Sequence, residues 1–103
     1  MNNLQFYING AWEDPATPEV IDVINPATEE SVGQISAGSA ADVNNAIAAA
    51  KTAFTSYSRF SVKERMDLLT EVREEYKRRF DDIAHAIMTE MGAQAIWQKA
   101  VRL

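Results

Sequence analysis

The sequence predicts an α+β domain, or part of one, in which short strands come first and helices follow. Three observations support this prediction. Asn9-Gly10 lies between aromatic and β-branched residues, as in a β-hairpin. Apolar residues then recur at helical spacings from Ser39 onward. The stretch Ser61–Gly92 contains no proline, and its only glycine is its last residue.

The composition limits the functions to consider. The chain has 103 residues, of which 47% are hydrophobic and 24% charged, with a net charge of −5, as in one ordinary globular domain. The negative balance argues against nucleic acid, because phosphate binding needs concentrated Lys and Arg. The absence of cysteine excludes disulfides and a cysteine nucleophile within these residues. The start lacks the pattern of a secretory signal, and no apolar run approaches the roughly 18 residues of a membrane span. We therefore expect a soluble, cytoplasmic protein that binds no membrane.

Two hairpins are expected within residues 1–38. The Asn-Gly pair favours a type I′ turn, because both central residues need positive φ. Asn25-Pro26-Ala27-Thr28 breaks the best strand candidate, since proline supplies no N–H. Gly33 and Gly38 lack the spacing of a dinucleotide fingerprint or a P-loop. The expected strands are residues 4–8, 11–14, 19–24 and 31–36.

The first helix is expected to open at Ser39, whose hydroxyl can accept from a free N–H at the helix start. Asp42 lies in the first turn, near the positive end of the helix dipole. The polar side of this helix includes Lys51. Its narrow apolar stripe consists of Val43, Ala46, Ile47, Ala50, Phe54 and Tyr57.

The second helix is expected to begin with a capping box between Ser61 and Glu64. Two ion pairs one helical turn apart, Glu74–Arg78 and Glu75–Arg79, are expected on its outer face as structural features. Its buried line is predicted to be Val62, Met66, Leu69, Val72, Tyr76 and Phe80.

A break near Phe80 separates a third helix, which Asp81 can cap and Gly92 can end. His85, the only histidine, falls one step off the apolar stripe, so we interpret it as a surface or boundary residue; a catalytic base is the alternative. Residues 93–103 are compatible with a final helix. The inward residues of the third helix are expected to be Ile83, Ala84, Ile87, Met88 and Met91.

Four segments, in this order and spacing, resemble the N-terminal part of the aldehyde dehydrogenase superfamily. They are Tyr7-Ile8-Asn9-Gly10-Ala11-Trp12, Val23-Ile24-Asn25-Pro26-Ala27-Thr28-Glu29-Glu30, Ala41-Asp42-Val43 through Ala53-Phe54, and Glu64-Arg65 through Glu90-Met91-Gly92. The resemblance implies that the chain is an α+β fragment of an α/β, Rossmann-like fold. It would then be a single N-terminal portion of a cofactor-binding domain, with hairpins in residues 1–38 and a helical layer in residues 39–103.

The resemblance also implies a chemistry. Family members oxidise aldehydes to carboxylic acids with NAD or NADP, using a cysteine nucleophile and a glutamate that activates water. These residues, an oxyanion-binding asparagine and the dinucleotide-binding turn lie downstream of the matched region, so none is assigned here. Some members hold a monovalent cation with a backbone carbonyl before the Asn-Pro turn and an acidic residue near the end of the third helix. These positions match Ile24 and Glu90; the plain alternative is a strand-end residue and a carboxylate in the last helical turn.

The sequence departs from the family at two places. Glu29 stands where glycine is common, so the turn either avoids positive φ there or bears the strain. Ala93 and Gln94 stand where Lys or Ala followed by Pro is usual. The likeness fades there, which suggests a truncation or a change of reading frame near residue 93.

Three hypotheses remain from the sequence. The first is an N-terminal part of an aldehyde dehydrogenase that is inactive alone and binds no NAD or NADP by itself, because it has no thiol and no evident dinucleotide cradle. The second is a non-enzymatic helical module that self-associates, or binds a full-length relative, through exposed apolar helix faces. The third is a self-sufficient α+β domain of unknown role.

Overall fold

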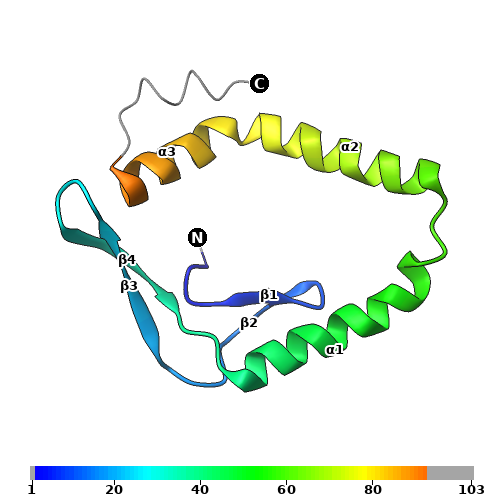
Figure 1. The fold of residues 1–103 in the computed structure, drawn as a ribbon, viewed down its shortest axis with the longest axis horizontal. Coiled ribbons are helices and arrows are strands. Elements are labelled where there is room, and N and C mark those ends of the chain that lie inside the picture. The colour runs from blue at the N-terminus through cyan, green and yellow to red at the C-terminus, as the bar shows by residue number, and fades with distance from the viewer. Residues whose placement is uncertain (1, 93–103) are drawn as a thin grey trace. The chain divides into compact units, whose positions relative to one another are not determined.

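The computed structural model describes residues 2–92 as two hairpins followed by three helices (Figure 1). The residues form two compact units: one holds the chain up to Asp22 together with Gly33–Phe60, and the other holds Val23–Val32 and the chain from Ser61 onward. The elements are β1 (Phe6–Ile8), β2 (Ala11–Glu13), β3 (Val20–Asn25), β4 (Glu30–Ser36), α1 (Ala40–Tyr57), α2 (Val62–Arg78) and α3 (Phe80–Met91). The predicted order of short hairpins before helices is confirmed.

In the first unit, β1 and β2 form the predicted antiparallel hairpin. Ile8 pairs with Ala11, so Asn9 and Gly10 alone make the turn. Their φ values of 53° and 79° are both positive, as a type I′ turn requires. Tyr7 and Trp12 are directly opposite, and their rings meet edge to face at 5.3 Å, which adds a cross-strand contact.

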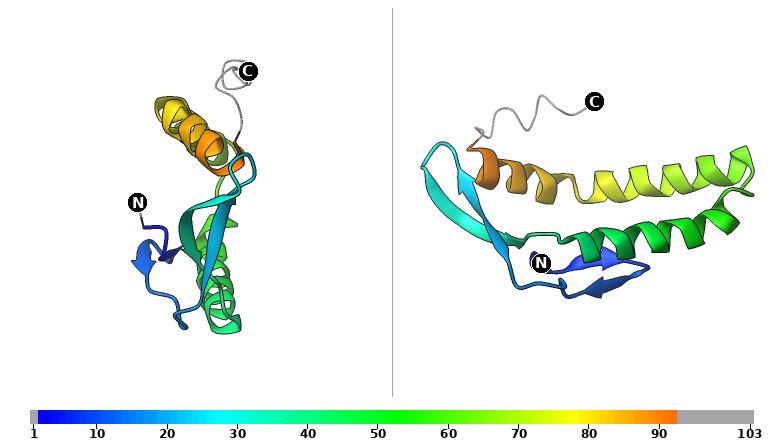
Figure 2. Two further views of the ribbon diagram at one scale, coloured as in Figure 1. Left: turned by 90° about the vertical axis from the view of Figure 1, so that its left-hand side faces the viewer. Right: turned by 60° about the horizontal axis from the view of Figure 1, so that its bottom comes forward.

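The same unit contains α1, which lies beside the β1–β2 hairpin (Figure 2). Ser39 caps this helix as predicted, and Asp42 completes a reciprocal capping box. Ser36, which is buried, donates its hydroxyl to the carbonyl of Leu4 at 2.7 Å. The Cβ position of Gly38 is 3.8 Å from Cζ of Phe6. These contacts connect the start of β1 and the chain just before it to the end of β4 and the segment that leads into α1.

The strands β3 and β4 pair as the second hairpin, and their turn is built around Asn25. The side-chain Oδ1 of Asn25 accepts a hydrogen bond from the N–H of Ala27 at 2.9 Å. The backbone carbonyl of Asn25 accepts one from the N–H of Glu29 at 2.8 Å. Glu29 has a φ of 60°, a left-handed conformation that is unfavourable for a residue with a Cβ. Of the two outcomes foreseen for Glu29, the turn therefore bears the strain.

The second unit contains α2 and α3. Ser61 and Glu64 form the predicted capping box. α2 ends before Arg79, whose φ of −102° and ψ of 14° interrupt the helix, and α3 begins at Phe80. The prediction that Asp81 caps α3 is wrong: the N-cap is Arg79, without a side-chain hydrogen bond, and Asp81 already lies in the first turn. The observed break thus lies at Arg79, one residue before the predicted position, and results from the backbone angles of that residue.

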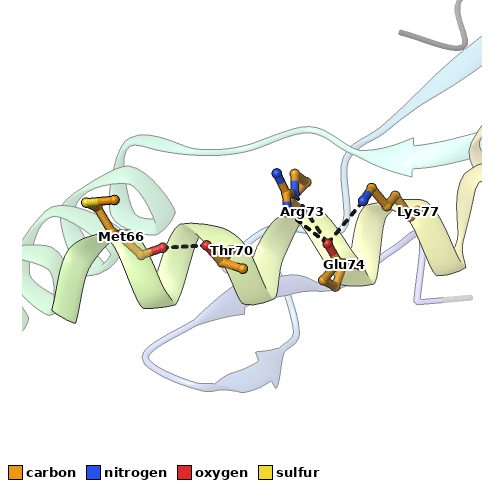
Figure 3. A network of polar contacts seen from close by, with 5 residues as sticks. All are labelled: Met66, Thr70, Arg73, Glu74 and Lys77. Atoms are coloured by element: carbon orange, nitrogen blue, oxygen red, sulfur yellow. Dashed lines mark hydrogen bonds and ion pairs between the residues drawn. The ribbon is translucent and has the colours of Figure 1, made fainter. Parts of the chain in front are cut away.

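The ion pairs of α2 differ in part from the prediction (Figure 3). Glu75 pairs with Arg79 as expected, and also with Arg78. The predicted Glu74–Arg78 pair is wrong, because Arg78 turns to Glu75 while Glu74 bonds Arg73 and Lys77, each at 3.1 Å. Glu74 therefore has two cations of its own helix as partners and does not pair with Arg78.

The expected burial of the helix stripes is wrong. On α2, Val62 is 70% exposed, Met66 62% and Leu69 67%. On α3, Ala84 is buried but Met91 is 65% exposed. Within residues 2–92, Ala84 is the only hydrophobic residue classed as buried. Apolar periodicity marks the face that a helix can bury, and these described residues do not cover it.

The possible final helix, residues 93–103, falls outside the described residues. Among the helices of residues 2–92, none is both long enough and apolar enough to cross a membrane. Gly92 ends α3 with a φ of 65°, as predicted for a glycine after a helix.

Candidate functional site

The candidate cation site predicted at Ile24 and Glu90 lies within the second unit. Ile24 is the penultimate residue of β3, half exposed, and Glu90 is an exposed residue in the last turn of α3. Residues close to them in the sequence approach each other. A Cβ placed on Gly92 would lie 2.4 Å from Cβ of Ala27 and 2.7 Å from Oδ1 of Asn25. The end of α3 therefore abuts the turn that follows Ile24.

Where the end of α3 meets the β3–β4 turn, backbone oxygens are more plausible cation ligands than a cluster of carboxylates. Residues 2–92 contain no group of three or more His, Cys, Asp and Glu side chains that could hold a metal ion. In the predicted site, Glu90 would be the charged ligand and the backbone carbonyl of Ile24 the neutral one. Asn25 Oδ1 already accepts from Ala27. The assignment of Ile24 and Glu90 to a monovalent cation site stays a prediction.

The start of α1 is closed by its own carboxylate. Asp42 is only 7% exposed; its Oδ2 accepts from the N–H of Ser39 at 2.9 Å and from the hydroxyl of Ser39 at 2.7 Å. Its Oδ1 accepts from the N–H of Ala16 at 2.9 Å. Hydrogen bonds from Ser39, first from its backbone and then from its hydroxyl, and then from the Ala16 N–H, hold the pKa of Asp42 below its ordinary value. The carboxylate is therefore charged at neutral pH.

The other two helix starts carry acidic residues as well. At α2, Glu64 accepts from the N–H of Ser61 at 2.7 Å, and this bond is the main reason that the pKa of Glu64 is lowered. At α3, Asp81 and Asp82 lie in the first turn. A helix start binds phosphate through free N–H groups and a positive field. Carboxylates occupy the starts of α1 and α2, so these two helix starts are not free to bind a phosphate group.

A shallow groove of about 300 Å³ lies between β1 and α1 in the first unit. Asp42 is its charged lining residue, and its carboxylate oxygens are already engaged by Ser39 and Ala16. The groove therefore offers an apolar surface without a polar group free to orient a ligand. Its lining consists of Phe6, Tyr7, Ile8, Gly38, Asp42, Val43 and Ala46.

His85 is exposed on α3. Its carbonyl accepts from the hydroxyl of Thr89 at 3.0 Å, which is an ordinary bond within a helix. This position agrees with the interpretation of His85 as a surface residue.

The role of Asp42 exceeds what the sequence suggested. The sequence predicted that Asp42 lies in the first turn of this helix, which is confirmed, and the structure adds its reciprocal capping bonds with Ser39. The bond from Ala16 could not be inferred, because it joins residues 26 positions apart. The two prolines around Ala16 were the available signal, since they restrict that loop.

Known proteins resemble this chain over most of its length. The pattern of the family described as the aldehyde dehydrogenase family matches residues 12–101. A protein of Staphylococcus haemolyticus named as an aldehyde dehydrogenase is 48% identical over 92 residues, which are 89% of this chain and 19% of that protein. The chain thus spans about one fifth of the length of the curated relatives that it matches.

Solved structures give the same result. An aldehyde dehydrogenase from Bartonella henselae matches with a TM-score of 0.89 and 42% identity, covering 94% of this chain and 20% of that one. A mutant of aldehyde dehydrogenase C from Pseudomonas syringae, crystallised with NAD+ and octanal, matches with a TM-score of 0.91 and 41% identity, covering 96% of this chain and 20% of that one. The sequence resemblance is confirmed: this chain belongs to the aldehyde dehydrogenase family and corresponds to an N-terminal segment of it.

Proposed function

We propose that this chain serves as the N-terminal part of an NAD-dependent aldehyde dehydrogenase, and that these 103 residues have no catalytic activity by themselves. The whole enzyme would oxidise an aldehyde to a carboxylic acid, passing a hydride to NAD+ and taking oxygen from water. The observation that carries the proposal is the likeness to the P. syringae enzyme, which was crystallised with NAD+ and octanal.

The proposed role of this segment is structural. The family's cysteine nucleophile has no counterpart here, because the sequence contains no cysteine, and covalent aldehyde oxidation requires an activated nucleophile. The acidic helix starts at Ser39 and Ser61 argue that the dinucleotide is held by other parts of the enzyme. The hairpins and helices would form outer layers of the cofactor domain. A cytoplasmic location is part of this proposal.

A segment exchange tests the proposal. Residues 1–103 replace the matching segment of the unmutated P. syringae enzyme, and NADH formation from octanal and NAD+ is followed by absorbance. We expect the chimera to keep activity within about tenfold of the parent, because the exchanged segment carries none of the reacting groups. A tenfold change corresponds to about 1.4 kcal/mol in barrier height. The isolated chain is expected to form no NADH.

Two controls define failure. The P. syringae enzyme without the segment shows what loss of this layer does, and circular dichroism shows whether the chimera is folded. A folded chimera without activity would contradict the proposed role, and so would NADH formation by the isolated chain.

A second candidate is a self-associating module, and the exposed face of α1 favours it. Val43 and Ile47 are each 53% exposed and Phe54 65%. The charged residues of α1 are only Asp42 and Lys51, so charge repulsion between two copies of this helix is small. Sedimentation equilibrium of the isolated chain would then show a dimer that Phe54→Asp dissociates. A monomer at all concentrations would contradict this candidate.

A further inference from the structure

We propose that the apolar face of α2 docks against an apolar surface rimmed by carboxylates, supplied by the downstream part of an aldehyde dehydrogenase polypeptide. This inference rests on the proposed function and specifies the chemistry of one of its interfaces. It is argued from the distribution of charge around α2.

The apolar face of α2 has the spacing of a helix-packing seam. Val62, Met66, Leu69, Arg73 and Tyr76 follow one another at alternating steps of four and three residues, which keeps them on one side of the helix. We call these residues the α2 seam. Met66 is 62% exposed, Leu69 67% and Tyr76 45%. One cation, Arg73, interrupts an otherwise apolar line.

The residues beside the α2 seam include cations and no acids. In the heptad that the seam defines, Lys63 and Lys77 flank it on one side and Arg65 on the other. Figure 3 shows Arg73 and Lys77 along the same helix as Met66. Every carboxylate of α2 falls at an outer position instead; these residues are Glu64, Asp67, Glu71, Glu74 and Glu75.

Three cations in or beside the seam, Lys63, Arg73 and Lys77, form exposed ion pairs. Lys63 bonds Asp67 at 2.6 Å, and Arg73 and Lys77 each bond Glu74 at 3.1 Å. The Lys63 side chain is 82% exposed and that of Arg73 65%, so these pairs are screened by water and are weak. A carboxylate on a docked surface would meet these cations where water is excluded, and the interaction there is stronger.

A second copy of the α2 seam is an unfavourable occupant. Pairing two seams side by side brings flanking residues of one helix against those of the other. Cations would meet cations, and two Arg73 side chains would enter the interface. Like charges placed together in an interface are strongly unfavourable. The pattern therefore selects a partner with acidic residues at its rim.

The relatives indicate where this partner comes from. The chain covers 94% of its own length in the match to the B. henselae enzyme but only 20% of that enzyme. Most of such a polypeptide lies outside these residues and is available to cover the exposed seam. We therefore assign the acidic-rimmed surface to that downstream part.

Charge reversal in the chimera described above tests the inference. Arg73→Glu lies in the α2 seam, and Arg78→Glu is its matched control at an outer position of the same helix. Both remove an exposed ion pair, with Glu74 and Glu75 respectively. In the chimera, we expect Arg73→Glu to raise the equilibrium constant for unfolding about tenfold more than Arg78→Glu does, because only Arg73 faces the partner.

Three further measurements complete the design. Arg73→Gln, which removes the charge without reversing it, is expected to fall between wild type and Arg73→Glu. In the isolated chain, the Arg73 and Arg78 variants are expected to unfold at equal urea concentrations, because the partner is absent. Added salt screens charges, so it is expected to reduce the difference in stability between the Arg73→Glu and Arg78→Glu chimeras.

The outcomes separate this inference from the proposed function. An active chimera in which Arg73→Glu and Arg78→Glu behave alike would overturn the docking inference only. An inactive chimera that still distinguishes them would overturn the proposed function only. A dimer of the isolated chain that Leu69→Asp dissociates would also overturn the inference, since a second copy would then occupy the seam.

Discussion

Asp42 connects the start of α1 to the loop that follows β2. Its carboxylate accepts from the backbone and hydroxyl of Ser39 and from the N–H of Ala16. At 7% exposure, this is the one buried charged residue among residues 2–92. A buried carboxylate is tolerated because each oxygen has a donor. The same side chain therefore caps a helix and positions a proline-flanked loop.

We predict that Asp42→Asn lowers the urea midpoint of the chain and reduces the dependence of its stability on pH. The folded pKa of Asp42 lies below its ordinary value of 3.8, so the unfolded state takes up a proton at higher pH than the native state. Stability is therefore present above the unfolded pKa and is lost as pH falls through the folded pKa. The asparagine amide also cannot accept both sets of bonds.

Urea unfolding at several pH values between neutrality and acid checks this prediction. Asp67→Asn, on the exposed face of α2, is the control and should leave the acid sensitivity largely unchanged. Equal pH profiles for wild type and Asp42→Asn would show that the bonds from Ser39 and Ala16 do not persist in solution.

At the scale of the elements, the boundaries set by local chemistry were predictable from the sequence. Ser39 and Ser61 mark the starts of α1 and α2. A hydroxyl followed three residues later by a carboxylate forms a capping box, which needs only residues close in the sequence. The start of α3 was misplaced, since Arg79 ends one helix and begins the next through its backbone angles. No side-chain pattern marks such a break.

The contact between α3 and the β3–β4 turn gives a prediction at this scale. Gly92 is in the left-handed region, and a Cβ on it would overlap Ala27 and Asn25. We predict that Gly92→Ala destabilises the chain by about 2 kcal/mol or more, combining the left-handed backbone penalty with the displacement of the turn. The shift is measured as a lower melting temperature.

Gly33→Ala is the control for Gly92→Ala, because a Cβ on Gly33 meets no atom within 4 Å and its φ is not positive. It should change the melting temperature little. If both substitutions had the same small effect, the close approach of Gly92 to the turn would be absent in solution.

At the scale of the whole molecule, the class of fold could be predicted from the sequence, but the exposure of the apolar helix faces could not. The exposed residues Met66, Leu69 and Phe54 were expected to be buried, because periodicity identifies an apolar face but carries no information on its partner. The site residues Ile24 and Glu90 came from family resemblance. The approach of Gly92 to Ala27 depends on tertiary contact between residues far apart in the sequence, which no local pattern encodes.

The division of the chain into two units has a consequence for folding. Residues Val23–Val32 belong to the second unit although they lie between two parts of the first. The contacts of the first unit that span this insertion, such as the bond from the N–H of Ala37 to the carbonyl of Glu19, close a loop and carry its entropic cost. Neither unit can be isolated by cutting the chain once. A single proteolytic nick between residues 23 and 32 would therefore cut the second unit and, at the same time, open the loop that joins the two parts of the first.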